Sequence, residues 1–413
     1  MTKQPRRSNV VGESRASRKP RDQRASRGQR EPRGQREPRV SSKPRIPLTP
    51  QALISLYRPD LAETLAEEDL PSFRYSQICE HLFSRPLRPF SEATALPGSL
   101  RDVLDTSGVS VLKQNGEQRA PDGTTKFLLE GSDGVGFEAV FMPYKSRATA
   151  CISSQIGCPV GCTFCATGAM GLKRNLSAAE IVDQVRTTQV RAAEEGLRLT
   201  NLVYMGMGEP LLNLRAVLDS VRIISDPHGL GMAHRSISIS TVGIPAGIRA
   251  LARSEPQVNL ALSLHAADDN IRATLIPGTF RHPIAEVLDA AWQHFDLTGR
   301  KLLVEYVLLG DINDSPNDGR RLAALLRGHV VAVNLIPWNP VPGLGRQERP
   351  FRPSKTPTPQ SSFRAPSLFR APSPMAVAAF RQALLDAHIE TVVRQSKGGG
   401  IGAACGQLAG GQR

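Results

Sequence analysis

Three cysteines within eight residues are the strongest chemical feature of this 413-residue sequence: Cys158-Pro-Val-Gly-Cys162-Thr-Phe-Cys165. Thiolates at this spacing wrap one metal centre, and Gly157 and Gly161 let the backbone curl around it. In a four-iron, four-sulfur cluster, three thiolates leave one iron open for a further ligand. Structural zinc needs four ligands, and Cys151 could supply the fourth, so zinc stays an alternative on these residues alone.

The use of cysteine indicates a reducing compartment. The chain has six cysteines, which are too few and too clustered for a disulfide framework at this length. Cys79 falls on a predicted helix and is expected to pack in the core.

No apolar run approaches the roughly 20 residues that cross a bilayer, and no secretory signal begins the chain. We expect a soluble cytoplasmic protein with no membrane partner, and an organellar transit peptide is the less favoured interpretation of the Arg/Ser-rich start.

Most of the positive charge lies in residues 1–45. This segment holds 15 Lys/Arg against four acidic residues, a net charge of +11 out of +14 for the chain. It has no aromatic residue and repeats Arg-Gly-Gln-Arg-Glu-Pro in tandem. Such a segment buries too little apolar surface to offset its ordering entropy, so we predict a disordered basic tail. Its positive charge is consistent with binding to nucleic-acid phosphates without sequence preference and, equally, with a solvated tail that binds nothing.

The remaining pattern predicts a helical domain (46–108), a short antiparallel β extension (109–147) and an α/β domain (148–408). Helices are expected at 51–57, 73–83 and 99–106, and strands of the extension at 126–129 and 137–141. In the α/β domain, strands are expected at 149–155, 201–205, 236–240, 259–264, 302–309 and 330–336. Helices fall between them, and Ser177 with Glu180 forms a capping box for 178–193. Six such units predict parallel strands with crossover helices, hence an open or partial barrel.

Two features complete this organisation. Residues 344–373 are rich in Pro, Ser and Arg and repeat Phe-Arg-Ala-Pro-Ser, which indicates a surface loop expansion, with RNA contact a minor alternative. A last helix at 375–387 and a last strand at 389–394 lead to the final cysteine, Cys405.

Six motifs in order resemble the bacterial radical S-adenosylmethionine (SAM) family that makes 2-methyladenosine in 23S ribosomal RNA and in transfer RNA. They stand at 151–158 (CISSQIGC), 205–213 (MGMGEPLLN), 240–243 (STVG), 262–266 (LSLHA), 334–340 (NLIPWNP) and 403–408 (AACGQL). The resemblance implies a partial (β/α)6 radical SAM barrel, with a [4Fe-4S] cluster on Cys158, Cys162 and Cys165. It further implies SAM as cofactor, 23S rRNA and tRNA as substrates, an electron donor such as flavodoxin or ferredoxin, a monomeric state and an RNA-binding helical domain.

The same resemblance implies which residues bind SAM. These are Gly208, Glu209, Ser240, Ser263, Leu264, His265 and Asn339. Each is expected near the C-terminal end of a predicted strand, where barrel folds assemble their ligand sites.

Radical chemistry suits the substrate, because adenine carbon 2 lies between two ring nitrogens and is too electron-poor to attack a methyl donor. As the family implies, Cys405 takes a methyl from SAM as a thiolate nucleophile. A 5′-deoxyadenosyl radical from a second SAM then removes hydrogen from that S-methyl group, and the carbon radical adds to the base. Cys151 attacks Cys405 to form a disulfide and release the product. Glu138, on the apolar strand 137–141, matches the carboxylate that moves the proton at carbon 2; on the residues alone, an exposed strand face is favoured.

Two alternatives and one departure remain. The related antibiotic-resistance enzyme that methylates carbon 8 shares these cysteines, and a non-catalytic RNA-binding protein would keep the fold without the reaction. Where the family has Arg-Gly and acidic residues, this chain reads Lys-Gly-Gly-Gly-Ile-Gly at 397–402. The added glycines predict a looser loop before Cys405, with reduced activity or a shifted RNA preference.

Overall fold

The computed structural model describes residues 46–84, 87–278, 280–341, 344 and 369–410. The predicted basic tail and most of the predicted loop expansion lie outside these residues. No helix within the described ranges is long and apolar enough to span a membrane.

The chain from residue 46 begins with four helices: α1 (Pro50–Tyr57), α2 (Pro59–Ala66), α3 (Ser72–Leu82) and α4 (Gly98–Ser107). The three predicted helices are confirmed, and α2 is additional. Thr49 caps α1 by accepting a hydrogen bond from the amide of Ala52 (3.2 Å), and a proline at the first position starts both α1 and α2. Cys79 on α3 is 2% exposed, so its expected place in the core is confirmed.

A meander of antiparallel strands follows, made of β1 (Lys113–Arg119), β2 (Thr125–Glu130), β3 (Gly136–Pro143) and β4 (Ala148–Cys151). Phe127 and Leu129 are buried on β2, as their alternation predicts. Strand β1 has no apolar alternation that would have predicted it, because all its residues are exposed at the sheet edge.

From β4 onward the sheet is parallel. Its order is β4, β7 (Leu199–Tyr204), β8 (Ile237–Thr241), β9 (Asn259–Ser263), β10 (Leu302–Leu308), β11 (Val331–Pro337) and β12 (Glu390–Val393). The six predicted units are therefore present, and β12 extends them as one more parallel strand. Strands β1 and β12 are the two edges, so the sheet stays open as a partial barrel.

The predicted strand at 149–155 is wrong in its second half. Strand β4 ends at Cys151, and residues 155–157 form a separate strand, β5 (Gln155–Gly157), paired with β6 (Leu172–Asn175). Ser153 explains the break, because its hydroxyl donates to Glu138 O (2.6 Å) and accepts from the Met207 amide (2.8 Å). These side-chain hydrogen bonds take the chain out of the sheet ladder.

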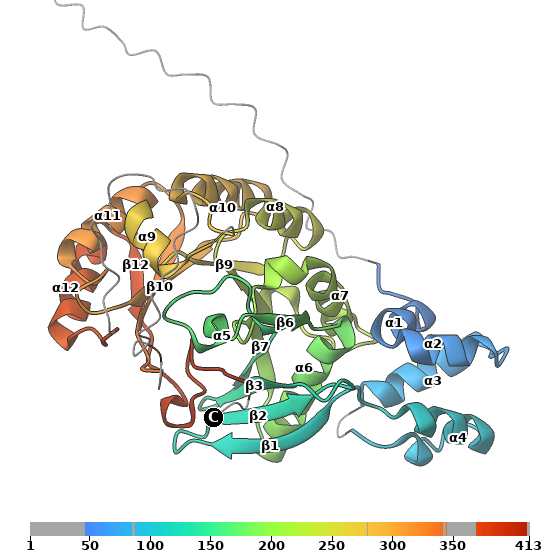
Figure 1. Cartoon of the computed structure of the whole chain (residues 1–413). Helices are drawn as coiled ribbons and strands as arrows, with labels where there is room; N and C mark the ends of the chain where they lie inside the picture. The colour runs from blue at the N-terminus through green and yellow to red at the C-terminus, as the bar shows by residue number, and fades with distance from the viewer. Residues whose placement is uncertain (1–45, 85–86, 279, 342–343, 345–368, 411–413) are drawn as a thin grey trace, which may run out of the picture. The chain divides into compact units, whose positions relative to one another are not determined.

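Helices connect the parallel strands along the outer side of the sheet, while the short α5 (Ala166–Ala169) lies on the inner side with β5 and β6 (Figure 1). The outer helices are α6 (Ala178–Glu194), α7 (Leu214–Ser225), α8 (Pro245–Ser254), α10 (Ile284–Thr298), α11 (Pro316–Leu326) and α12 (Pro374–Leu385); α9 (Asp269–Leu275) precedes α10. The predicted capping box of α6 is present.

A buried ion pair joins the N-terminal helices to α6. Asp183 and Arg186 are 1% and 2% exposed in their side chains and lie 2.6 Å apart. The hydroxyl of Tyr57 on α1 donates to Asp183, and Arg186 donates to the carbonyl of Leu82 (2.7 Å). This network ties the helices that precede the barrel to the helix that follows the three-cysteine loop.

Candidate active site

Two adjoining cavities lie at the carboxyl ends of the parallel strands, the end where barrel folds assemble ligand sites. The cluster cavity (about 150 Å³) is lined by the three clustered cysteines and by Glu209, Ser240, Ser263 and His265. The thiol cavity (about 320 Å³) is lined by Cys151, Met142, Tyr144 and the segments 392–397 and 403–406. Cys405, Arg394, Asn339 and Met205 line both.

The loop that carries the three cysteines is fixed at its base by backbone contacts. The amide of Cys158 donates to Gly171 O (3.0 Å), next to the β5–β6 pair. Gly157 has φ +75°, and a Cβ placed there would lie 1.8 Å from the same Gly171 oxygen. Only glycine fits at this close approach, which gives the predicted curl of the backbone a specific cause.

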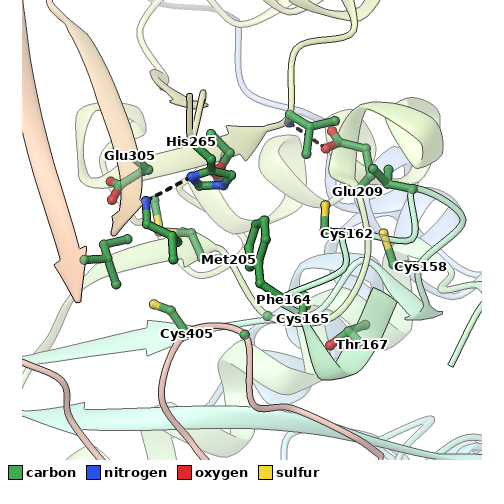
Figure 2. Close-up of a pocket in the computed structure, with 18 of the residues that line it drawn as sticks. Cys158, Cys162, Phe164, Cys165, Thr167, Met205, Glu209, His265, Glu305 and Cys405 are labelled. Carbon is green, nitrogen blue, oxygen red and sulfur yellow. Dashed lines mark hydrogen bonds between the residues drawn. The ribbon is translucent and has the colours of Figure 1, made fainter. Parts of the chain in front are cut away.

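The rest of the loop is hydrogen-bonded to segments that are distant in the sequence. The Thr163 amide donates to Leu275 O (3.0 Å), and the Trp338 indole N–H donates to Phe164 O (3.0 Å). Ala166 N donates to Gly406 O (2.8 Å), and the Thr167 hydroxyl donates to Leu408 O (2.7 Å). The last two bonds join the loop to the segment that carries Cys405. Figure 2 shows the three cysteines on one continuous turn and Cys405 on a separate segment.

The three thiols suit a multi-iron cluster in their chemistry. Burial raises the pKa of each above the usual thiol value, for Cys158 to about 12, so three thiolates here need a nearby positive charge. Within the described ranges, no three His, Cys, Asp or Glu side chains converge as the ligands of one metal ion do. A cluster takes one thiolate at each iron, so its thiolates need not converge on one point. This arrangement does not favour the zinc alternative.

Glu209 follows β7 and is 3% exposed. Its carboxylate accepts hydrogen bonds from the amides of Val242 (2.9 Å) and Leu211 (3.0 Å). Burial raises its pKa to about 7, although these amides favour the charged form. Gly208 has φ +101°, and a Cβ there would lie 2.6 Å from the side chain of Gln155, so this turn also requires glycine.

The expected SAM residues on the next strands also lie at the cluster cavity. The hydroxyls of Ser240 and Ser263, at the ends of β8 and β9, are 2.9 Å apart. Leu264 is fully buried and lies next to this wall without lining the cavity through its side chain.

His265 is held as a neutral ring. Its Nδ1 accepts a hydrogen bond from the Val307 amide (3.1 Å), and burial lowers its pKa to about 3. A neutral histidine that accepts at Nδ1 carries its proton at Nε2, so that nitrogen is a donor. The residue adopts a left-handed backbone (φ +61°), which Asn313 supports by donating to His265 O (2.7 Å).

Cys151 and Cys405, far apart in the sequence, line the same thiol cavity as free thiols. Burial, with the nearby Cys405 as a smaller cause, raises the pKa of Cys151 to about 12. The Asn339 amide group donates to Cys405 O (3.2 Å) and accepts from the Ser396 hydroxyl. Asn339, expected at SAM, therefore also holds the cysteine segment.

The loop at 397–402 forms a hydrogen-bonded turn. Gly398 O accepts from the amides of Ile401 (3.1 Å) and Ala403 (3.0 Å), and Gly398 N donates to the Asp122 carboxylate (3.2 Å). An aspartate from the β1–β2 turn thus contacts this loop, in which the family's own acidic residues are absent. The expected looseness of the loop stays a prediction.

Glu138 on β3 is 3% exposed, so the alternative of an exposed strand face is wrong. It lines neither cavity. Its carboxylate accepts from the amides of Ala409 (2.7 Å) and Gly410 (3.1 Å) and pairs with Lys126 Nζ (3.0 Å). In this structure, the expected proton-moving carboxylate holds the chain just beyond Cys405.

Several residues that line the cluster cavity were not assigned a role from the sequence, among them Met205, Glu305, Trp338 and Arg394. Glu305 gave the same signal as Glu138, a carboxylate within an apolar strand, and it is also 3% exposed. Arg394 follows the last strand and lies 3.9 Å from Glu305. Its partnership depends on how β10 and β12 are arranged in the sheet.

The fold and the cysteine loop together define a radical SAM enzyme. The family model of the radical SAM superfamily matches residues 152–316. A solved structure of a radical SAM methyltransferase from Sphaerobacter thermophilus is 40% identical and superposes with a TM-score of 0.76. That similarity covers 87% of this chain and 97% of the other.

Curated relatives give the family. A dual-specificity RNA methyltransferase RlmN from Syntrophobacter fumaroxidans is 44% identical over 85% of this chain and 95% of its own length. A probable member from a strain of Thermus thermophilus is 43% identical over 84% of this chain and 92% of its own length. The chain belongs to the RlmN family of dual-specificity RNA methyltransferases, and its cofactors are a [4Fe-4S] cluster and SAM.

Proposed function

We propose that this enzyme methylates carbon 2 of an adenine in the peptidyl transferase centre of 23S rRNA and in tRNA, with Cys405 as the methyl carrier. One observation carries the proposal: among the cysteines outside the three-cysteine loop, Cys405 alone lines both cavities, so its thiol borders that loop and also the space that holds Cys151. A carrier must reach both a methyl source and a target base.

Cys158, Cys162 and Cys165 would hold the cluster. Gly208, Glu209, Ser240, the segment 263–265 and Asn339 would hold SAM. When bound, these groups supply a methyl group to a thiolate and, after reduction, a radical able to remove a hydrogen atom from a methyl group. The His265 Nε2 donor and the buried Glu209 carboxylate are polar groups of opposite character, suited to orienting a zwitterionic ligand.

The chain's own residues divide the remaining work. Cys405 carries the methyl group as a thioether to the base. Cys151 then attacks the Cys405 sulfur as a thiolate: the disulfide forms as the bond between that sulfur and the transferred carbon breaks, and the carbon keeps the electron pair and takes up a proton, so that the methylated base can leave. Glu138 would move the proton at carbon 2; it lines neither cavity, and this role is supported by the contact of its buried carboxylate with the segment just beyond Cys405.

The wider setting follows from this proposal. The helical domain 46–108 would contact RNA, followed by the β extension 109–147 and the catalytic domain 148–408. The enzyme would act as a cytoplasmic monomer and receive electrons from a flavodoxin or ferredoxin.

Anaerobic reconstitution followed by mass spectrometry of nucleosides from a treated 23S rRNA fragment and a treated tRNA tests the proposal. We expect 2-methyladenosine from both substrates, none with Cys405→Ala, and an enzyme–RNA adduct that accumulates with Cys151→Ala. Production of 8-methyladenosine instead would show that the enzyme methylates carbon 8 and would contradict the proposed methylation of carbon 2. A protein that binds RNA but assembles no cluster would contradict the enzymatic proposal.

A further inference from the structure

The chain beyond Cys405 is held by several independent contacts. Gln407 donates through its side chain to Pro340 O (2.8 Å), and Leu408, which is 4% exposed, accepts from Thr167 through its carbonyl (2.7 Å). The amides of Ala409 and Gly410 both donate to one oxygen, Oε2, of Glu138. Residues 407 to 410 are therefore each held by at least one hydrogen bond.

The carboxylate of Glu138 has a cationic partner as well as its two amide donors. A buried carboxylate is costly unless it is paired and hydrogen-bonded. Its second oxygen, Oε1, pairs with Lys126 Nζ at 3.0 Å, and the lysine side chain is only 14% exposed. Lys126 stands opposite Val140 and Glu138 opposite Leu128, so the two residues are diagonal neighbours on one face of the β2–β3 pair.

The anchored segment also lies against the backbone of β3. A Cβ on Gly136 would come within 3.3 Å of Gly410 O, and a Cβ on Gly410 would lie 2.9 Å from Gly136 O. Gly410 has φ +61°, a conformation that favours glycine. The two glycines let the segment come close enough for the amides to reach Glu138.

We propose that Lys126 and Glu138 act as one anchor that fixes the chain just beyond Cys405 and thereby positions the Cys405 thiol between the two cavities. Lys126 is a positioning residue, because it reaches Cys405 only through Glu138 and the amides of 409 and 410. The inference rests on the proposed function, because positioning the Cys405 thiol between the cavities matters for catalysis only if this thiol carries the methyl group.

The anchor has a consequence for the acid/base role proposed for Glu138. Oε2 accepts both amides, whereas Oε1 pairs with Lys126. Protonation of Oε2 would displace an amide donor, so anchoring and proton transfer at that oxygen exclude each other.

Hydrogen exchange on the anaerobic holoenzyme without RNA tests the anchor. Four variants are compared: Lys126→Met, Lys126→Arg, Glu138→Gln, and Lys301→Met as a matched control that removes an exposed ion pair with Glu390 (2.7 Å). Lys126→Met and Glu138→Gln should speed amide exchange in peptides covering 403–410 by roughly tenfold or more. That factor corresponds to about 1.4 kcal/mol, which is below the usual strength of one charged hydrogen bond.

A second readout follows the thiol itself. Alkylation of Cys405 by iodoacetamide, measured by peptide mass spectrometry, should accelerate in the same two variants. Lys126→Arg should restore the wild-type rate, because it keeps the cation, and Lys301→Met should leave both readouts unchanged. Recovery by Arg separates an electrostatic anchor from a simple packing role.

Unchanged exchange at 403–410 in both Lys126→Met and Glu138→Gln would overturn the anchor. Equal acceleration in Lys126→Arg would also overturn it. If Lys126→Met fails to fold, the near-isosteric Glu138→Gln still gives the exchange result. Neither readout uses RNA or turnover, so a protein that makes no 2-methyladenosine but shows these changes would refute the proposed function and leave the anchor standing.

Discussion

The close approach of Gly157 to Gly171 gives a sharp test of how the cysteine loop is built. In Gly157→Ala the new Cβ would lie 1.8 Å from Gly171 O, whereas real Cβ atoms essentially never come within 3.0 Å of another heavy atom. One of the two backbones must therefore move by about 1.2 Å, the difference between these distances. That movement breaks the 3.0 Å bond from Cys158 N to Gly171 O and displaces the first cluster cysteine.

Gly161→Ala is the matched control in the same loop. Gly161 has φ +70°, close to the +75° of Gly157, but a Cβ there meets nothing within 4 Å. Both variants should carry the cost of a left-handed alanine, about 1–2 kcal/mol. Gly157→Ala adds overpacking of about 1–3 kcal/mol, for a total of about 2–5 kcal/mol.

The assay is iron and sulfide content after anaerobic reconstitution, together with the visible absorption of the cluster. We expect Gly161→Ala to hold a near-complete cluster. The extra cost of about 1–3 kcal/mol in Gly157→Ala should weaken cluster binding relative to this control by about fivefold to a hundredfold, since each 1.4 kcal/mol is a factor of ten. If Gly157→Ala holds as much iron and sulfide as the control, the loop tolerates the displacement and the close contact does not position Cys158.

Two further predictions concern stability. Asp183→Asn leaves the buried Arg186 without its counter-charge and should lower the free energy of unfolding, measured by urea titration, by about 3 kcal/mol. Glu117→Gln, which breaks a partly exposed ion pair with Arg191, should lower it by less than about 1 kcal/mol. Equal losses in the two variants would contradict the role of burial. Burial lowers the pKa of His294 to about 4, so the folded state resists protonation, and the stability that the neutral ring contributes is present above pH 6.5 and lost as the pH falls towards 4. Between pH 7.5 and 5.5 the wild type should lose about 1.4 kcal/mol that His294→Phe does not lose, and parallel pH profiles would refute the assignment.

Sequence patterns predicted the structure correctly where the contacts that they depend on are made within a few residues. The spacing of Cys158, Cys162 and Cys165 indicated one loop, because a single turn spans them. The capping box of Ser177 and Glu180 marked the start of α6, since its hydrogen bonds are made within one helical turn. The strands from β7 to β11 were found from their apolar runs, as is typical of a parallel sheet covered by helices.

Sequence patterns failed to predict the structure where a residue's partner is distant in the sequence. Strand β1 is fully exposed and polar, and it is a strand only because β2 pairs with it. The break after Cys151 depends on Ser153 reaching Glu138 and Met207, which no local pattern shows. Glu138 itself looked like an exposed polar position, because Lys126 and the amides of 409 and 410 that stabilise its burial were not visible in its neighbourhood.

By itself, the sequence determined the parts: the cysteine loop, the alternating strands and helices, and the motifs whose residues are predicted to bind a cluster and SAM. Tertiary structure alone decided that Cys405, from the end of the described chain, lines both cavities, and that Glu138 holds the segment beside it. The physical reason is range. Thiolate spacing, capping and side-chain alternation act within a few residues, whereas the sharing of one thiol between two cavities depends on how strands far apart in the chain lie side by side in the sheet.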